Sequence, residues 1–276
     1  MSVLSRLLRS PEGAAGLAIL LLLGLMALFA GVLFPGDPLS IAGPALVPPF
    51  TNASFPLDTD RLGRNVLAEL VHGTHASLAV GIAAAVVALI IGSVVGTLAG
   101  FAGGLIDEAL MRVVDAFQIV PAFLLALAFV SVAGASLPVV VLAIALGAWT
   151  APARLARTEV LSIRERDYVA AARVIGMRPL EIAFREILPN ALPPVLALSS
   201  VIVASSVLIE AALSFLGLSD PNIVTWGSMI AEGRNVLRSA PFLSIFPGIA
   251  LMVTVLGVYL FSEGLAEMLQ RRRARA

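Results

Sequence analysis

Six long apolar runs alternate with polar segments along the chain. Each run is nearly free of charge and about as long as the ~20 residues that a helix needs to cross a hydrocarbon core of ~30 Å. A cleaved signal peptide fits the first run less well, because its apolar core would be only about 7–15 residues long. We therefore predict an all-α polytopic membrane protein with six transmembrane helices. The predicted spans are residues 14–33, 77–101, 113–133, 137–153, 193–209 and 242–261.

Two local patterns modify these spans. Small residues every four positions let helix backbones approach closely in a bilayer, so a glycine stripe in the second run predicts a packing seam. A seam that slides or rotates during function is the alternative interpretation. Pro121 lies inside the third run and predicts a kink, because proline removes one backbone hydrogen bond. The stripe consists of Gly92, Gly96, Gly100 and Gly104.

A charged segment, Asp167–Pro193, separates the fourth and fifth runs. Its first part is rich in alanine and predicts a helix that ends at Gly176, since glycine favours the left-handed C-cap conformation. Pro179 suits the first turn of a second short helix, which we expect to end at Leu188-Pro189. The two helices would form a bracket beyond the bilayer. The apolar face expected for the second helix comprises Leu180, Ile182, Ala183, Ile187 and Leu188.

Two further segments are predicted to lie outside the membrane. Residues 34–60 carry six prolines, which exclude a spanning helix and indicate an exposed loop. This loop leads into a polar turn, Asp58–Asn65, whose arginines taken alone would be solvated. After the fifth run, residues 211–217 and 220–239 are predicted to form a second loop.

Composition confirms the class and removes several functions. The chain is 59% hydrophobic and 13% charged, with a mean hydropathy of +1.00, values that indicate an integral membrane protein. The absence of cysteine excludes disulfides and thiolate metal sites. All eighteen basic residues are arginine, and a phosphate-binding P-loop requires a lysine. This chain is therefore not predicted to be an enzyme, and any ATPase that drives it must be another polypeptide.

The arginines also predict the orientation. Fourteen lie in the N-terminal tail, the turn at 102–112, the segment around 154–185 and the C-terminal tail, and only four lie in the intervening loops. Basic residues are retained on the cytoplasmic side. We therefore expect both termini and the bracket in the cytoplasm, with the proline-rich loop outside.

The bracket resembles the cytoplasmic EAA loop of bacterial ABC importer permeases. That pattern has Glu-Ala-Ala, a glycine after three more residues, and Leu-Pro about twelve residues further on. The corresponding positions here are Ala170–Ala172, Gly176 and Leu188-Pro189, with Ala170 replacing the glutamate.

Three further strings resemble the peptide and nickel branch of these permeases, specifically its C-type permease. Asp58–Asn65 is similar to the Gly-Thr-Asp-x-x-Gly-Arg-Asp signature, with Asp58 in place of glycine and Asn65 in place of the last aspartate. Leu213–Leu218 reads Leu-Ser-Phe-Leu-Gly-Leu, and Thr225–Ser228 contains the expected Trp-Gly. The resemblance covers most of the chain.

The resemblance implies a type I ABC importer permease fold in the bacterial inner membrane. It divides the chain into a tail, first span and periplasmic loop at 1–60, and a permease domain at 61–276 with a coupling loop at about 164–192. The implied partners are a second homologous permease, two ATPase subunits that carry ATP and Mg, an extracytoplasmic binding protein and membrane lipid, but no nucleic acid. No metal or cofactor is expected in this chain. The residues expected to face the ATPase are Ala170, Ala171, Gly176, Met177, Arg178, Pro179, Leu180, Glu181 and Pro189.

The cargo implied is a peptide or a related small solute. Dipeptides, oligopeptides, nickel complexes, glutathione and opines share this scaffold, so the resemblance does not select one of them. An ion-gradient-driven secondary transporter is the alternative, with Glu210 as the candidate membrane carboxylate. A membrane-embedded hydrolase is a weaker alternative, since His72 and His75 lack an H-E-x-x-H pattern and are expected to be solvated or interfacial.

Overall fold

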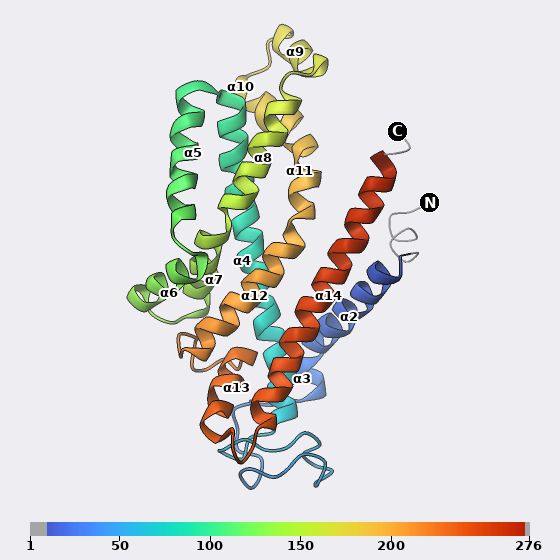
Figure 1. Ribbon diagram of the computed structural model, residues 1–276, viewed down its shortest axis with the longest axis vertical. Helices are drawn as coiled ribbons and strands as arrows, with labels where there is room; N and C mark the ends of the chain where they lie inside the picture. The colour runs from blue at the N-terminus through green and yellow to red at the C-terminus, as the bar shows by residue number, and fades with distance from the viewer. Residues whose placement is uncertain (1–9, 274–276) are drawn as a thin grey trace.

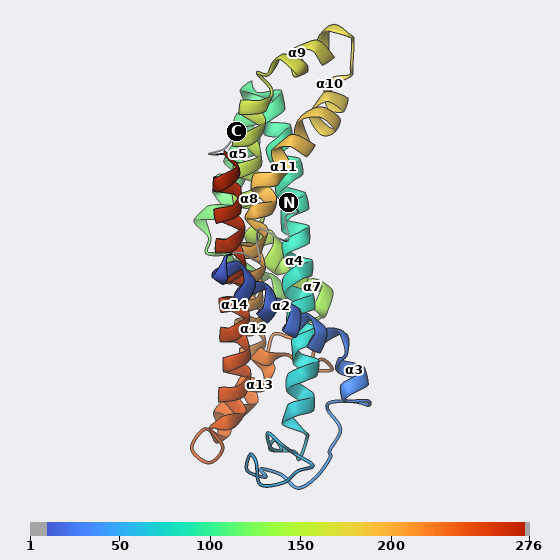
Figure 2. The ribbon, with the colours of Figure 1, turned by 90° about the vertical axis from the view of Figure 1, so that its right-hand side faces the viewer.

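The computed structural model describes residues 10–273, with side chains as far as residue 265, and its regular elements in that range are all helical (Figure 1). Most helices run along the long axis of an elongated molecule (Figures 1 and 2). Three are long and apolar enough to cross a membrane by themselves. These are α2 (Pro11–Leu28), α4 (Val66–Ala102) and the Phe242–Leu265 part of α14 (Phe242–Arg273).

Three pairs of helices could each form one further, broken span. Counting each pair as one crossing gives up to six candidate spans among the described residues, as the sequence predicted. The bends between partners are 85°, 47° and 53°. The pairs are α5 (Gly104–Ile119) with α6 (Ala122–Ala133), α7 (Leu137–Ala148) with α8 (Thr150–Ile163), and the 179–197 segment with α12 (Ser199–Phe215).

The glycine seam lies between α4 and α8. A Cβ on Gly96 would stand 2.2 Å from the carbonyl oxygen of Ala153, and Gly92 and Gly100 meet backbone oxygens of α8 nearly as closely. The predicted packing role is confirmed for these three glycines. It is wrong for Gly104, which starts α5 and has nothing within 4 Å of a built Cβ.

Pro121 breaks its span instead of kinking it. Val120 and Pro121 both have extended backbone, with ψ values of 125° and 131°. A residue before proline is pushed out of the α region, and proline itself has no N–H to donate. The helix therefore stops at Ile119, and α6 runs across the end of α5 (Figure 1). The prediction of a continuous helix here was wrong.

The two histidines join α4 to the N-terminal segment, where α2 packs along α14 (Figure 1). Nε2 of His72 lies 3.0 Å from the carbonyl oxygen of Phe34, and Nδ1 of His75 lies 3.1 Å from that of Ala27. His75 is exposed, as predicted, whereas His72 is half-buried. Both hold backbone carbonyls at the end of the first segment, next to α3 (Ala30–Leu33).

The region after the fifth span is more ordered than predicted. α12 continues to Phe215, so 211–217 belongs mainly to a helix, and Gly217 caps its end with φ +81°. A short helix, α13 (Trp226–Gly233), and the 3₁₀ turn η2 (Arg234–Val236) follow. The side chain of Trp226 is fully buried, and its Nε1 donates to the carbonyl oxygen of Leu70 at 3.2 Å. A capping box between Thr225 and Ser228 starts α13, and the contact of Trp226 with α4 holds it in place.

Candidate functional site

The predicted bracket begins with a helix that ends as expected. α9 (Asp167–Val174) is followed by Gly176 at φ +84°. The N–H of Met177 donates to the carbonyl oxygen of Ala172 at 3.2 Å, and that of Gly176 to Arg173 at 3.1 Å. This pair of bonds is a Schellman C-cap, which fixes the direction of the chain after the helix.

The second helix of the bracket differs from the prediction at its far end. α10 (Pro179–Glu181) passes into a π-helical stretch, η1 (Ile182–Ile187), and then directly into α11 (Leu188–Ala197). Leu188-Pro189 therefore begins an element, and the predicted termination there was wrong. A π turn carries i→i+5 bonds, and this wider turn accommodates the missing N–H of Pro189, which would interrupt a regular α-helix.

The inner face of the bracket is apolar and buried. Ile182 and Ile187 pack with Val160 and Val169 in one cluster, and Ala183 is buried as well. Leu180 was expected on this face but is 64% exposed, so that assignment was wrong. The cluster holds the bracket against the end of α8 and leaves Leu180 on the outside.

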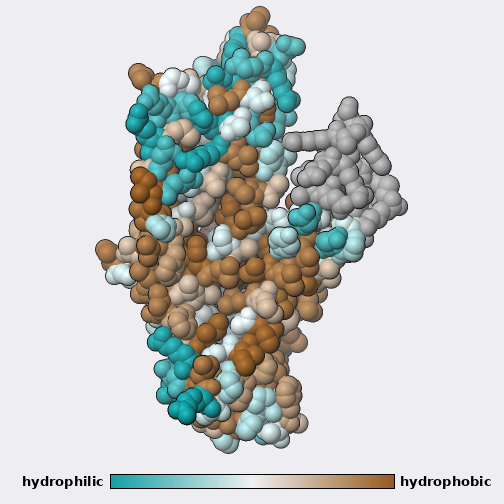
Figure 3. All heavy atoms as spheres, in the orientation of Figure 1, coloured by the Kyte–Doolittle hydropathy of each residue, from teal (hydrophilic) through white to brown (hydrophobic). Residues whose placement is uncertain are grey.

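The structure places most of the predicted ATPase-facing residues on one projecting tip. α9 and α10 extend beyond the ends of α5 and α8 (Figure 2), on a part of the surface with many hydrophilic side chains (Figure 3). Pro189 is exposed as well but lies further along, on α11. The residues exposed at the tip are Ala170, Ala171, Gly176, Arg178, Pro179 and Leu180, whereas Met177 and Glu181 are half-buried.

Sequence reasoning missed two residues of the tip. Val174 is 88% exposed and Ile175 is 76% exposed, and both stand between Arg173 and Arg178. The helix period contains the signal: the buried positions of α9 are Val169 and Ala172, and Val174 and Ile175 fall off that stripe. Together with Leu180, which is 64% exposed, they give the tip three exposed apolar side chains, which we call the apolar knob; Arg173 and Arg178 flank them in sequence.

The base of the bracket is fastened to α4 and α5 by two arginines of the α8 segment. Arg157 contacts both carboxylate oxygens of Asp107, at 2.5 and 2.6 Å. Nη1 of Arg164 donates to the carbonyl oxygen of Gly100 at 2.8 Å. The bidentate, charge-assisted contact of Arg157 is geometrically specific, and together with the single Arg164 bond it joins the base of the bracket to α5 and α4.

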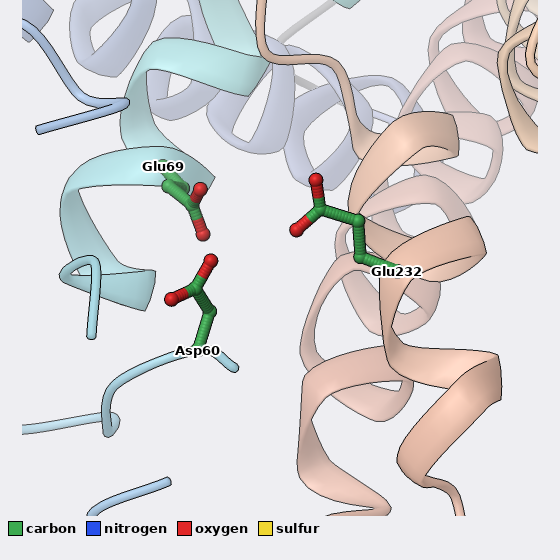
Figure 4. A group of neighbouring side chains, drawn as sticks. All are labelled: Asp60, Glu69 and Glu232. Carbon is green, nitrogen blue, oxygen red and sulfur yellow. The ribbon is translucent and has the colours of Figure 1, made fainter. Parts of the chain in front are cut away.

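The opposite end of the molecule contains a charged cluster centred on Arg64. Its guanidinium lies 3.8 Å from Asp60, 3.6 Å from Glu69 and 3.5 Å from Glu232. The three acids come from the 58–65 turn, α4 and α13 (Figure 4). The expectation of solvated arginines holds for Arg61, which is exposed, but is wrong for Arg64.

Asp58 occupies an unusual position beside this cluster. Its φ is +138°, a value that favours glycine. The side chain is fully buried, and neither carboxylate oxygen has a hydrogen-bond partner. Burial, together with the charge of Asp60, raises the pKa of Asp58 to about 8. The backbone at this position suits the glycine of the signature that the turn resembles.

The same surroundings also shift the pKa of Glu232. Desolvation raises its pKa above the ordinary glutamate value, and the charge of Asp60 acts in the same direction, while Arg64 opposes them. Desolvation and like charge both disfavour an ionised carboxylate.

Glu210 lies in the protein interior near the α13 end. It is almost completely buried, and its Oε1 accepts a hydrogen bond from Ser214, one turn further along α12, at 2.6 Å. Its side chain lines a small, open pocket together with Asp220 and Thr225. The carboxylate of the secondary-transporter alternative is therefore bonded within its own helix.

Comparisons with known proteins match this chain to membrane components of transport systems. Residues 92–275 match the family described as the binding-protein-dependent transport system inner membrane component. A probable peptide ABC transporter permease protein, y4tQ, from Sinorhizobium fredii is 41% identical over 97% of this chain and 91% of its own length. The di/tripeptide transport system permease protein DppC of Pseudomonas aeruginosa is 36% identical over 92% of this chain and 86% of its own.

Two further matches are a glutathione permease and a solved transporter structure. The glutathione transport system permease protein GsiD of Pectobacterium atrosepticum is 35% identical over 93% of this chain and 85% of its own. An inward-facing structure of the MetNI methionine ABC transporter superposes with a TM-score of 0.57 at 18% identity, covering 72% of this chain and 96% of that one. The last match concerns the fold, and it confirms the expected ABC importer permease architecture. This chain belongs to the family of inner membrane components of binding-protein-dependent transport systems.

Proposed function

We propose that this chain is the permease subunit through which an ATP-driven importer moves peptides into the cytoplasm. The observation that carries the proposal is the tip of the bracket: the exposed apolar side chains of Val174, Ile175 and Leu180 lie beside a hydrogen-bonded C-cap, with Arg173 and Arg178 next to them in sequence. An exposed apolar patch with a polar rim marks a protein-interaction site. Family membership supplies the partner class, a separate ATPase subunit.

The proposed orientation places the tip in the cytoplasm. Seven arginines lie between residues 154 and 185, and retention of basic residues on the cytoplasmic side supports this placement. Arg6, Arg9 and Arg275 also enter the count but lie outside the described residues. Both termini would then be cytoplasmic, and the 34–65 loop and α13 would face an extracytoplasmic binding protein.

The proposed mechanism transmits movement from the ATPase to the spans. The apolar knob would dock in a groove of the ATPase subunit, and Arg173 and Arg178 would contact its polar rim. When two ATPase subunits close on ATP, the brackets of this chain and of a second permease would move together. The fastened arginines, Arg157 and Arg164, would carry that movement into α4 and α5.

The proposed cargo rests on the relatives. Most of the named relatives are peptide or dipeptide permeases, and one is a glutathione permease, itself a transporter of a peptide-like solute. We infer the same class of cargo here, delivered by the binding protein. The proposed division of the chain at residue 60 separates the loop that would meet this protein from the permease domain.

The test combines copurification with transport. Tagged wild-type protein is expected to recover a second permease and a P-loop ATPase, and to support ATP-dependent uptake of a labelled dipeptide in proteoliposomes. Leu180→Asp and Met177→Glu are expected to remain in the membrane yet lose the ATPase and the uptake. Ile41→Asp, an exposed apolar position of the opposite loop, is the matched control and should retain the ATPase. Recovery of the chain alone, active under an ion gradient without ATP, would refute the proposal.

A further inference from the structure

Three carboxylates from separate segments converge near the start of α4 (Figure 4). Asp60 belongs to the preceding turn, Glu69 to the first turn of α4 and Glu232 to the end of α13. One carboxylate oxygen of each lies within 4.8 Å of the others. Asp60 is 3% exposed and Glu69 is 4% exposed, whereas Glu232 lies open to the outside.

The Asp60 carboxylate is held in place by its own turn. Its Oδ1 accepts hydrogen bonds from the N–H groups of Leu62 at 2.8 Å and Arg64 at 2.7 Å. Its Oδ2 is buried and has no hydrogen-bond partner. The carboxylate points toward that of Glu69 (Figure 4). A buried carboxylate oxygen without a partner is costly, so this fixed atom identifies a place for a ligand.

Arg64 does not complete the cluster. Its Nη1 donates one long hydrogen bond, of 3.5 Å, to Oε1 of Glu232 and lies 3.6 Å from Glu69. Its Nε lies 3.8 Å from Oδ2 of Asp60, too far for a hydrogen bond, so both of these buried atoms lack a hydrogen-bond partner. When all three carboxylates are ionised, one guanidinium leaves an excess of two negative charges, and a bound cation would favour that ionised state. The exposed Arg61 also lines the small pocket beside the cluster, but it forms no ion pair with these carboxylates among the described contacts.

We propose that Asp60, Glu69 and Glu232 bind a hard divalent cation of the Ca²⁺ class. The donors are all oxygens, which such ions prefer. Ca²⁺ binds oxygen at about 2.4 Å, so oxygens on opposite sides of the ion stand about 4.8 Å apart. A cleft of about 540 Å³, lined by Arg64, Glu69 and Glu232, reaches the cluster and provides an entry path for the ion and for water ligands.

The bound ion would join three segments at one point. It would tie the turn before α4 to α4 itself and to α13, and it would balance the excess negative charge. The position of α13 relative to α4 would then depend on the ion. This inference is independent of the cargo and of the ATPase contact, because all of its ligands lie at the opposite end of the chain.

The experiment measures Ca²⁺ binding to the purified permease complex in lipid nanodiscs after chelation, by equilibrium dialysis with radioactive Ca²⁺. One saturable Ca²⁺ per chain is expected, with a dissociation constant of about 0.1–1 mM, as in extracellular modules. Glu69→Gln and Glu232→Gln should each weaken binding roughly tenfold or more. Glu232→Gln is the less disruptive variant, since Glu232 is half-exposed.

Glu108→Gln provides the control. Glu108 is an exposed carboxylate on α5, paired with Arg112 at 2.7 Å, and lies away from the cluster. Its variant is expected to bind Ca²⁺ like the wild type. The absence of saturable binding up to about 10 mM, above the range of weak protein sites, would overturn the proposal. Equal binding by Glu232→Gln, Glu108→Gln and wild type would overturn it too.

Discussion

The two ends of the molecule differ in the kinds of side chain that they expose and bury. At the bracket end, apolar side chains such as Val174 and Ile175 stand in the open, and the ion pair Glu181–Arg185 is solvated. At the α13 end, the chain buries charged residues and a tryptophan, and joins segments far apart in sequence. The difference agrees with the proposed docking of a partner protein at the first end, whereas contacts within the chain itself hold the second end together. The two ends are distinguished by which side chains are exposed to the surroundings and which are buried.

The largest expected effect tests whether the α13 end supports itself. Trp226→Ala removes a fully buried side chain and its bond to Leu70, and should destabilise the protein by about 3–5 kcal/mol. Thermal unfolding in nanodiscs would measure it. Tyr259→Ala, at an exposed position of α14, should change the midpoint little. An unchanged midpoint for Trp226→Ala would break the comparison.

The next prediction tests the open end. Val174→Asp or Ile175→Asp should weaken association with the ATPase by about 2 kcal/mol, or roughly thirtyfold, as for a central apolar anchor. The thermal midpoint of the isolated chain should not change, because neither side chain is buried. Pull-down at graded ATPase concentrations is the measurement. If Ile41→Asp weakens association equally, the tip has no special role.

A smaller change of opposite sign is expected next to the acidic cluster. Asp58→Gly should stabilise the protein by about 1–3 kcal/mol, because it relieves a glycine-like backbone and removes a buried carboxyl without partners. Asp58→Asn keeps the side chain and the backbone strain, so it should recover only part of this gain. Chemical denaturation would compare the two variants. Equal stabilisation by both would assign the whole cost to the buried carboxyl group and none to the backbone.

The smallest effect concerns the ion pair of the tip. Glu181→Gln should cost less than about 1 kcal/mol, as expected for an exposed pair at i, i+4 spacing. Asp107→Asn, which breaks the less exposed contact with Arg157, should cost more. Thermal unfolding of both variants would compare the two losses of stability, one at the solvated tip and one at the base of the bracket. A larger loss at Glu181 would contradict this prediction.

Local signals predicted a large part of this structure. The apolar runs located the membrane helices, and Gly176 marked a helix end because its cap depends on only five neighbouring residues. The Gly92–Gly100 repeat predicted a close helix contact because glycines four residues apart lie on the same face of a helix. The ATPase-facing residues were expected from the resemblance to the EAA loop, whereas the exposure of Val174 and Ile175 could have been predicted from the helix period.

Contacts between distant residues account for the failures. Leu188-Pro189 looked like a stop, but a π turn and the packing of Ile187 carry the helix onward. Arg64 looked solvated because its partner Glu232 lies 168 residues away. Such pairings leave no mark in the local sequence, so the acidic cluster was not predictable.

The length of α4 has a mechanical consequence. Its 37 residues make a rod of roughly 55 Å, nearly twice the thickness of a bilayer core. The glycine seam clamps α8 to its upper part, and Glu69 meets the acidic cluster at its other end. If such a rod pivots at one end, a tilt of about 5° moves the other end by about 5 Å, from its length alone. A movement of about 5 Å at one end of this rod is therefore similar in size to the spacing of the carboxylate oxygens in the proposed cation site, which lie within 4.8 Å of one another.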